Sequence, residues 1–401
     1  MSAAPTSTKT NSKAAQQKPY LILISLDGFR WDYVEKYQPP HLTSFIKSGV
    51  KAESLVPSFP TETFPNHYTI ATGLYPDNHG IVGNIFYDYE QDTLYNKRNS
   101  TLVQDGRFYG GSPIWLEANK ADMVTASYFF VGTEADIQGV HPTYYYKFDN
   151  NVANEERVDQ TLRWLQQDDE TRPHLITQYF GDIDRVGHMI GTSKEEELKE
   201  AIFALDKNLG DLFEGVAETG LPVNIMIVSD HGMTDQLVSN IIPFESFENE
   251  DLFTTINSAT CASIHPHEHV SADSVLQYLR QKENHFTAYK TEDTPGFEYN
   301  PQSENWGPIQ VVADYGYCFW SQRQKSFFAN KGVTTFGIHG HDSKHKEMHG
   351  IFYASGPAFK DNYTTPSFKN IHVYPLMCEV LGLNIPTEID GNIDEVKTVL
   401  K

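Results

Sequence analysis

Short apolar runs alternate along the chain with longer stretches in which apolar residues recur every three or four positions. The short runs predict buried strands at residues 20–26, 124–132, 174–182, 223–233 and 349–357. The stretches 154–167 and 194–220 have helical periodicity, and Gly220 marks the expected end of the second. Strands that alternate with helices of this length predict an α/β fold, in which helices cover both faces of a mostly parallel sheet.

Two further helices are expected. The segment 64–73 follows a turn and carries Pro65 in its first turn, where the missing N–H costs nothing. Residues 368–386 form an amphipathic pattern closed by Gly382 and Pro386.

The pattern also predicts how the chain is divided. Residues 1–18 are small and polar, and we expect a disordered tail. At 401 residues the chain exceeds the size at which one core usually stops growing, so one large domain with an insertion, or two domains, is expected. We assign residues 19–401 to a single domain with an insertion. Between about 240 and 335 that pattern changes to hairpin-like strands and turns, which predicts a small inserted subdomain.

Composition limits which partners the protein can bind and which residue types could hold a metal. A formal net charge of -22 argues against nucleic-acid duplexes and anionic membranes as partners. No stretch is apolar for long enough to span a membrane, and the polar first 18 residues do not read as a signal peptide. Three widely separated cysteines form no metal-binding pair and no disulfide framework, although one disulfide stays possible. Any metal must therefore be held by His and carboxylate side chains.

Acidic and imidazole side chains occur where the predicted strands end. Several apolar runs stop abruptly at an Asp followed closely by Gly, as expected where a buried strand delivers a carboxylate to the edge of an α/β sheet. The candidate ligands are Asp27, Asp184, His188, Asp230, His231 and His339. Six ligands exceed one tetrahedral zinc site and suit a pair of divalent ions, which is the usual arrangement for displacement at phosphorus. The chain is therefore expected to be a two-metal hydrolase.

Turnover also requires an attacking oxygen, and Thr63 is the best candidate. It lies at a turn before the helix predicted at 64–73, where free N–H groups favour an anion. Thr61 and Ser58 are close enough to compete on chemistry alone, and a purely structural capping role for Thr63 is the alternative.

The motifs LDGFR, TFPNHYTIATGLYPDNHGIVGN, DIDRVGH, SDHGM, HGHD and IFYASGP together resemble the nucleotide pyrophosphatase/phosphodiesterase family of the alkaline phosphatase superfamily. This resemblance covers about residues 20–395 and implies an alkaline phosphatase-like three-layer sandwich with two Zn²⁺ per chain. It implies that one Zn²⁺ is held by Asp184, His188 and His339. The other is held by Asp27, Asp230 and His231 and also binds the Thr63 oxygen. The resemblance further implies a phospho-threonine intermediate and assigns Asn84 as an amide donor to a phosphoryl oxygen.

Aromatic residues indicate the substrate. Members of the family that cleave nucleotides stack the base on aromatic rings at positions that correspond to Phe64 and Tyr179, worth about 1–3 kcal/mol per base. The run Tyr144, Tyr145, Tyr146 and Phe148 could add a wall, and core packing is the alternative for each of these rings. Glu62 stands where some members have Lys, which argues against a strong preference for nucleoside triphosphates.

The expected activity is the release of nucleoside monophosphates from phosphodiester or pyrophosphate bonds. Dianionic monoesters need extra cations, and no Lys-x-Arg pair occurs at a matching place; Lys147 stands alone among aromatic residues. Diester cleavage is therefore favoured. A phospholipid or glycerophosphodiester hydrolase is the alternative within the family, and a non-catalytic relative is the alternative outside the enzymes. The resemblance favours an extracytoplasmic protein, with a signal absent from this chain, and the sequence leaves the oligomeric state open.

One other cluster of residues could bind metal. His341, His345 and His349 are spaced as if on one helical face and could form an extra site, although the resemblance uses only His339 of this segment.

Overall fold

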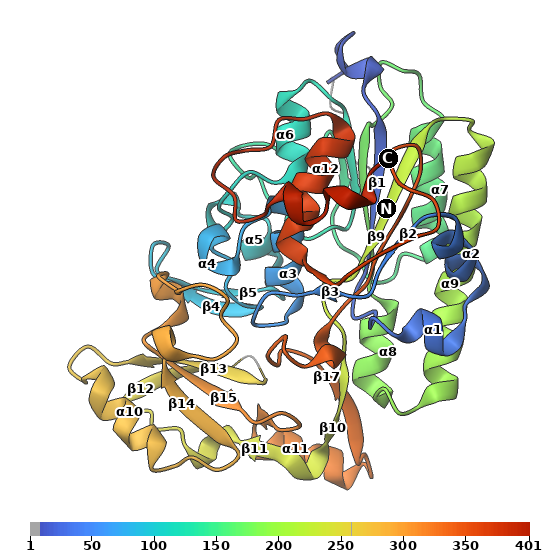
Figure 1. Ribbon diagram of the computed structural model, residues 1–401. Coiled ribbons are helices and arrows are strands. Elements are labelled where there is room, and N and C mark those ends of the chain that lie inside the picture. The colour runs from blue at the N-terminus through green and yellow to red at the C-terminus, as the bar shows by residue number, and fades with distance from the viewer. Residues whose placement is uncertain (1–8, 258) are drawn as a thin grey trace.

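The computed structural model describes residues 9–257 and 259–401, and its centre is a sheet of eight strands (Figure 1). In spatial order the strands are β19 (Tyr363–Thr365), β2 (Val50–Ala52), β18 (Phe352–Ser355), β9 (Val223–Val228), β1 (Tyr20–Leu26), β8 (Leu175–Phe180), β6 (Thr125–Tyr128) and β7 (Tyr144–Tyr146). All neighbouring pairs are parallel except those that β18 makes with β9 and β2. The mostly parallel sheet predicted from the sequence is confirmed.

Helices cover both faces of this sheet because its central strands are apolar on both sides. In β1, Leu21 and Leu23 belong to one hydrophobic cluster, whereas Ile22 and Ile24 belong to a second cluster on the opposite face. The first face is covered by α3 (Thr63–Thr72), α6 (Ile114–Lys120) and α12 (Val373–Leu381). The second is covered by α2 (Pro40–Ser48), α7 (Asn154–Leu165) and α9 (Glu195–Glu218). The expected three-layer sandwich is thus confirmed.

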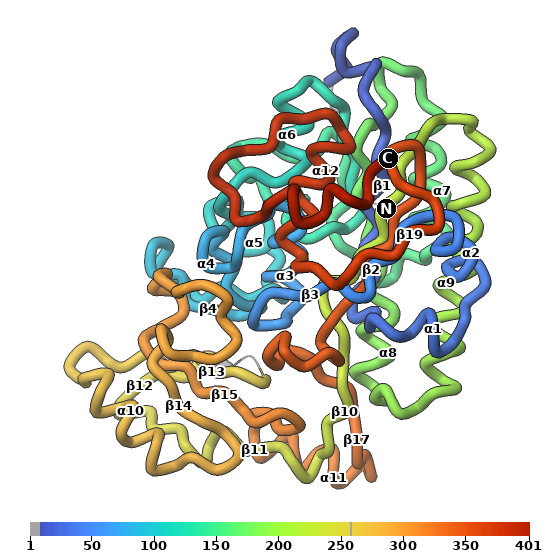
Figure 2. Tube along the Cα trace, in the orientation of Figure 1, coloured from blue at the N-terminus to red at the C-terminus, as the bar shows by residue number. Residues whose placement is uncertain are grey.

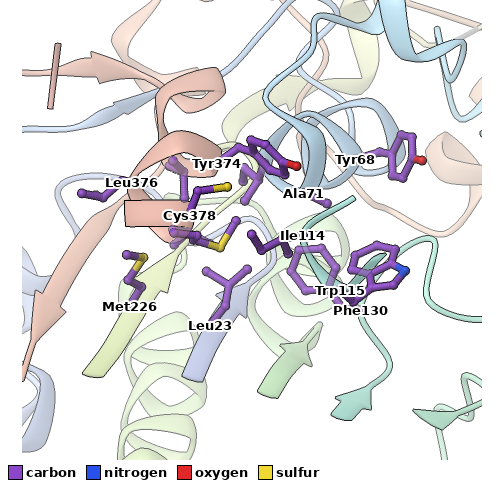
Figure 3. Close-up of a cluster of buried hydrophobic side chains, with 14 of the residues drawn as sticks. Leu23, Tyr68, Ala71, Ile114, Trp115, Phe130, Met226, Tyr374, Leu376 and Cys378 are labelled. Carbon is purple, nitrogen blue, oxygen red and sulfur yellow. The ribbon is translucent and has the colours of Figure 1, made fainter. Parts of the chain in front are cut away.

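The first of these clusters fixes where α3 lies. Figure 3 shows Leu23 of β1 and Met226 of β9 facing Leu376 and Cys378 of α12, with Ala71 of α3 packed at the side. Every residue of α3 except Phe64 is buried. Since α3 is held on all sides, its N-terminus is a rigid support for whatever side chains lie there.

Shorter helices and a hairpin complete the main part of the chain. They include α1 (Tyr33–Tyr37), α4 (Pro76–His79), α5 (Ser100–Val103), α8 (Asp182–Ile190) and the hairpin of β4 (Ile85–Asp88) and β5 (Thr93–Asn96). A two-stranded pair joins β3 (Leu55–Val56) to β20 (Phe368–Lys369).

The residues between about 240 and 335 form a separate unit beside the main sheet. Its four-stranded sheet has the order β12 (Phe253–Asn257), β13 (Cys261–Pro266), β15 (Ile309–Ala313) and β14 (Phe286–Lys290), and α10 (Ala272–Arg280) packs on it. This sheet has a hydrophobic cluster of its own. The short strands β11 (Ile241–Pro243) and β16 (Cys318–Trp320) pair beside α11 (Gln322–Asn330). We treat the unit as an inserted subdomain.

An antiparallel ribbon joins this subdomain to the main sheet. Figure 2 shows β10 (Thr234–Leu237) and β17 (Thr335–Ile338) running side by side between the two parts. Thr234 pairs with Ile338 and Leu237 pairs with Thr335. The chain therefore enters and leaves the subdomain at neighbouring points.

The expectation of a disordered tail over residues 1–18 is wrong for residues 9–18; residues 1–8 lie outside the described part. Asn11 is buried, and its side-chain amide donates to the carbonyl oxygens of Asp169 and Arg172 at 2.8 and 2.7 Å. Its side-chain oxygen accepts a hydrogen bond from the N–H of Val124 at 2.7 Å. One side chain thus satisfies three backbone groups, and polar composition alone does not reveal this.

Candidate active site

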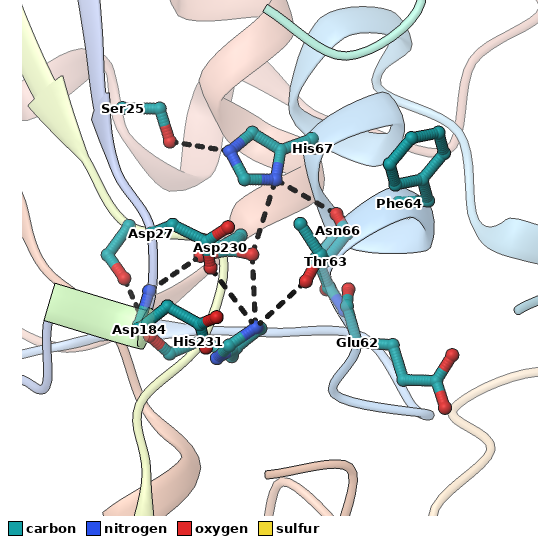
Figure 4. Close-up of polar contacts among 12 residues, drawn as sticks. Ser25, Asp27, Glu62, Thr63, Phe64, Asn66, His67, Asp184, Asp230 and His231 are labelled. Atoms are coloured by element: carbon teal, nitrogen blue, oxygen red, sulfur yellow. Dashed lines mark hydrogen bonds and ion pairs between the residues drawn. The ribbon is translucent and has the colours of Figure 1, made fainter. Parts of the chain in front are cut away.

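Three carboxylates meet at the carboxyl edge of the central sheet. Asp27 directly follows β1, and Asp230 follows β9 after one intervening residue. Asp184 arrives through the turn after β8, in the first turn of α8. Because β1, β8 and β9 are adjacent and parallel, their carboxyl ends lie together. The convergence of these carboxylates was predicted from the sequence, and Figure 4 shows them side by side.

The prediction that all six ligands stand at the ends of sheet strands is only partly right. Asp184 and His188 lie on α8, and His339 follows β17, which is not part of the central sheet. Helix α8 reaches the site because Gly28 lets it approach closely. Gly28 has a φ of 66°, and an added Cβ would lie 2.9 Å from the Cα of Asp184.

The candidate ligands form two overlapping groups. Oxygen and nitrogen atoms of Asp27, Asp230 and His231 lie within 4.8 Å of one another, and so do those of Asp184, His231 and His339. His188 joins the second group, because its Nε2 is 3.3 Å from Oδ1 of Asp184. His231 and His339 are stacked with ring centroids 3.6 Å apart. The structure thus brings together all six predicted residues, with His231 central to both groups.

The three histidines among the candidate ligands are oriented by backbone carbonyl groups. The Nδ1 of His188 donates to the Gly337 oxygen at 2.9 Å, and that of His231 donates to the Gly232 oxygen at 2.8 Å. The Nδ1 of His339 donates to the Thr61 oxygen at 2.8 Å. Each ring therefore presents the lone pair of Nε2 to the site, which is the arrangement seen where a second hydrogen bond orients a metal-binding histidine.

Asp27 and Asp230 are buried and Asp184 is partly buried, and each has a buried oxygen without a hydrogen-bond partner. Among the described residues no hydrogen-bond partner reaches Oδ1 of Asp27, Oδ1 of Asp184 or Oδ2 of Asp230. Burial and the neighbouring Asp230 and Asp184 raise the pKa of Asp27 well above its usual value. Burial would also raise the pKa of Asp184, but the adjacent His188 and His339 hold it below its usual range. Orphaned carboxylate oxygens beside imidazole nitrogens fit divalent cations.

Thr63 is the only one of the three candidate hydroxyls that lines the cavity at this site, within the described chain. Its Oγ1 lies 3.5 Å from Nε2 of His231 and 3.4 Å from Nζ of Lys97. Thr61 instead donates its hydroxyl to the His341 carbonyl oxygen and accepts from the N–H of Gly340. Ser58 donates to the side-chain oxygen of Asn370. Thr61 and Ser58 are therefore occupied by structural hydrogen bonds.

His67 connects Thr63 to the candidate ligands. Its Nδ1 lies 2.9 Å from the Thr63 carbonyl oxygen and 3.2 Å from Oδ2 of Asp230. Its Nε2 lies 2.8 Å from the hydroxyl oxygen of Ser25 (Figure 4). The signal in the sequence was the spacing: His67 is one helical turn after Thr63, on the same side of α3.

Asn84 is tied to both neighbours of Thr63. Its side-chain oxygen accepts a hydrogen bond from the N–H of Phe64 at 3.0 Å. Its own N–H donates to the buried carboxylate of Glu62 at 2.7 Å. The Nδ2 group of the amide is left for another acceptor, since no described residue accepts from it. Glu62 thus helps to hold the loop of Asn84 in place.

A cavity of about 1020 Å³ opens over Thr63, Asp27, Asp184 and His188. Phe64, Tyr179 and Phe148 also line it. Tyr179 is more than a wall of this cavity, because its hydroxyl donates to Oδ2 of Asp27 at 2.5 Å. Its ring meets the rings of His67 and Phe148 edge-on, with centroids 5.4 and 6.0 Å away.

The aromatic run that precedes Phe148 contributes little to this cavity. Tyr144 and Tyr146 contact Trp164, and Tyr145 stacks on His141. Of the four aromatic residues, Phe148 alone is in the cavity lining, within the described part of the chain, and it is 45% exposed. An alternating strand shows which rings share a face but not which face meets a cavity.

A cation beside Thr63 was missed in the sequence. Lys147, the lysine noted among the aromatic residues, donates to the side chain of Gln104 and does not line the cavity. Lys97 lines it instead and approaches the Thr63 hydroxyl. Lys97 is not part of a Lys-x-Arg motif. It reaches the site because the hairpin of β4 and β5 brings it there, and this pairing is not visible as a local sequence motif.

The histidines that follow His339 do not share a helical face. His345 stacks on Tyr315, with ring centroids 4.0 Å apart. The Nε2 of His349 donates to the Ser343 oxygen and its Nδ1 bonds Ser54. Within the described residues no metal-binding group includes them, so the structure does not support an extra site there.

Two features outside the site bear on the expectations from composition. All three cysteines are buried and unpaired in the part of the chain that the structure describes. Among the same residues, we find no helix that combines the length and the apolar character needed to cross a membrane.

Residues 21–350 match the family described as type I phosphodiesterase / nucleotide pyrophosphatase. The chain belongs to this family. It is 31% identical over 388 residues to human ectonucleotide pyrophosphatase/phosphodiesterase family member 5, covering 96% of the chain and 78% of the relative. It is 32% identical to bis(5'-adenosyl)-triphosphatase ENPP4 of Bos taurus, with 98% and 84% covered. The named members are phosphodiesterases and nucleotide pyrophosphatases, which are hydrolases.

A venom phosphodiesterase of Crotalus durissus collilineatus is 33% identical over 98% of the chain, which spans 48% of that relative. The chain therefore covers about half of the venom enzyme and about four-fifths of the family member 5 and ENPP4 proteins. The fold also matches a solved structure of murine ENPP5, an inactive threonine-to-alanine variant in complex with AMP. That match has a TM-score of 0.87 and 29% identity, and it covers 96% of this chain and all of the other. The alkaline phosphatase-like architecture is thereby confirmed.

Proposed function

We propose that this protein hydrolyses phosphodiester or pyrophosphate bonds of nucleotides and releases nucleoside monophosphates, with Thr63 as nucleophile and two Zn²⁺ as cofactors. The observation that supports this best is the position of the Thr63 hydroxyl. It lines the cavity and lies 3.5 Å from Nε2 of His231, the residue shared by both candidate ligand groups.

The donor set supports zinc. Carboxylate oxygens and imidazole nitrogens are common zinc ligands, and the described site offers no thiolate. Asp184, His188 and His339 would hold one ion, and Asp27, Asp230, His231 and the Thr63 oxygen would hold the other. Bound there, the ions would lower the pKa of a hydroxyl and neutralise charge on phosphoryl oxygens.

The reaction then proceeds in two displacements at phosphorus. The Thr63 hydroxyl gives its proton to water and its oxygen attacks the phosphorus atom. The bond to the leaving oxygen breaks, the leaving group takes up a proton from water, and a covalent phospho-threonine forms. Water attacks the same phosphorus from the vacated side, which breaks the bond to Thr63 and releases the nucleoside monophosphate. The His67 contact with the Thr63 carbonyl oxygen holds the residue in place for both steps.

Asn84 is proposed to donate its Nδ2 group to a non-bridging phosphoryl oxygen. For Asn84→Ala we expect kcat to fall about 10²-fold with little change in KM, because such a donor acts mainly on developing charge. Steady-state kinetics on a nucleotide diester measure this split. Asn78→Ala is the matched control, since Asn78 bonds Asp390 away from the cavity. A rise in KM with unchanged kcat would instead assign Asn84 to ground-state binding.

A nucleotide is the proposed substrate because aromatic faces flank the proposed phosphoryl position. Phe64 directly follows the nucleophile, and Tyr179 and Phe148 line the same cavity. Among relatives, ENPP4 is named a bis(5'-adenosyl)-triphosphatase and murine ENPP5 was solved with AMP. The inactivity of the alanine variant of ENPP5 is consistent with a catalytic threonine.

The names of these ectoenzymes and of the venom phosphodiesterases lead us to propose an extracytoplasmic location.

A panel of substrates tests the proposal. Zinc-loaded protein is assayed on a dinucleoside polyphosphate, a nucleotide aryl diester and glycerophosphocholine, with product analysis by chromatography. We expect nucleoside monophosphate from the first two and much slower turnover of the third. Faster cleavage of glycerophosphocholine would favour the lipid-related alternative, and no cleavage of any diester would refute the proposal.

A further inference from the structure

The hairpin of β4 and β5 brings Lys97 and Asn84 to the same place. The two residues flank the open end of the hairpin, where Ile85 pairs with Asn96. The backbone N–H of Lys97 donates to the Asn84 carbonyl oxygen at 3.0 Å. Asn84 is hydrogen-bonded to Glu62 and Phe64, the two neighbours of Thr63. These hydrogen bonds therefore also hold Lys97 close to Thr63.

The side chain of Lys97 points to the reaction centre. Its Nζ is 3.4 Å from Oγ1 of Thr63, and it lies 5.9 Å from the centroid of the Phe64 ring. A cation at that distance from an aromatic face is attracted to it, so the ring helps to hold the ammonium group in position. In the described part of the chain Lys97 forms no ion pair with a carboxylate. In a chain of net charge -22, an ammonium group inside this cavity that contacts a hydroxyl and forms no ion pair with a described carboxylate is suited to binding an anionic ligand.

We propose that Lys97 is a catalytic residue that donates to a non-bridging oxygen of the phosphoryl group, and that it allows the site to turn over phosphate monoesters as well as diesters. The inference rests on the proposed function, because it takes Thr63 as the attacking group. The reason given from the sequence for favouring diesters over monoesters, the lack of a nearby cation, is thereby revised.

The physical reason is the charge of the two substrate classes. A diester carries one negative charge on its phosphoryl oxygens, whereas a monoester carries two near neutral pH. Attraction to a fixed cation grows with that charge and is strong where water is excluded. During transfer the charge is spread over the non-bridging oxygens, where Lys97 can reach it. The bond from Thr63 to phosphorus forms, the bond to the leaving oxygen breaks, and Lys97 keeps its proton throughout.

Substitution at Lys97 tests this on an aryl monoester, such as p-nitrophenyl phosphate, beside an aryl diester of a nucleotide. For Lys97→Met we expect kcat/KM on the monoester to fall about 10²-fold, as when one donor to a developing oxyanion is removed. The loss on the diester should be about tenfold smaller, because its charge is lower. Lys97→Arg keeps the charge and should recover most of the monoester activity. Lys147→Met, the same change outside the cavity, should alter neither rate.

A binding measurement separates this inference from the proposed function. Inorganic phosphate is titrated calorimetrically into zinc-loaded wild-type protein and Lys97→Met, with metal content measured in both. We expect the variant to keep its metal and to bind phosphate about tenfold more weakly, whether or not the protein cleaves diesters. Failure of the wild type to cleave any diester would refute the proposed function alone. Unchanged phosphate affinity, or equal losses of kcat/KM on the two substrates, would overturn the role of Lys97.

Discussion

Thr63→Ala is expected to abolish turnover while leaving the metal-binding groups intact. The six candidate ligands remain in this variant, and the attacking oxygen is lost. Removal of a nucleophile commonly lowers kcat by factors on the order of 10³ or more. The measurement is kcat on a nucleotide diester together with zinc content by atomic spectroscopy and binding of AMP by calorimetry.

Thr63→Ser is the matched control, because it keeps a hydroxyl at the same backbone position and should keep measurable activity. Helix α3 gains no side-chain cap at its N-terminus from the described residues, so the alanine change is not expected to unfold the helix. If Thr63→Ala retained more than about a tenth of the wild-type rate, the threonine would not be the nucleophile, and attack by water would be the better account.

Removal of the metal ions should have the second large effect, on both activity and stability. A strong chelator is expected to abolish activity, because the buried carboxylates then repel one another and no cation neutralises the phosphoryl group. A ligand present at about 1,000 times its Kd stabilises the folded state by about 4 kcal/mol, so the melting temperature should also fall. Differential scanning calorimetry before and after chelation measures the fall, and re-addition of zinc should reverse it.

Asp184→Ala makes the same test on one of the two groups. It should lower the zinc content by about one ion per chain and reduce kcat strongly, because Asp184 is central to the group that includes His188 and His339. Asp182→Asn is the control on the same helix: Asp182 pairs with Arg185 and should leave the zinc content unchanged. Full zinc content in Asp184→Ala would show that Asp184 does not bind metal.

The elements that place the carboxylates could be predicted from the sequence, because their signals are local. A buried parallel strand is a continuous apolar run, and Asp27 and Asp230 mark where two such runs end. Thr63 could be placed at the start of a helix for a similar reason, since Pro65 is tolerated only in a first turn.

The remaining features depend on which segments meet in space. His231 contacts both ligand groups because β17 returns His339 to its ring, and no periodicity reveals that return. Lys97 depends on the pairing of β4 with β5, and Asn11 on packing against segments far along the chain. The hydroxyl of Tyr179 donates to Asp27 because the register of β1 and β8 places the two residues close together. Composition does not reveal any of these contacts. For this reason the sequence predicted disorder for residues 9–18 and did not reveal Lys97 as a cation in the site.

The ribbon of β10 and β17 has a consequence for how the protein is made. Asp230 and His231 precede β10, whereas His339 follows β17, so the whole inserted subdomain lies between them in the chain. During synthesis the ligand set cannot be complete until the subdomain has been translated and the ribbon has closed. The ion held by Asp184, His188 and His339 would then act as a late cross-link that joins α8 to the segment after the subdomain, whereas the other ion would join β1 to the segment before it. Such long loops are costly to close, and coordination bonds are one way to hold them once the polypeptide has left the ribosome.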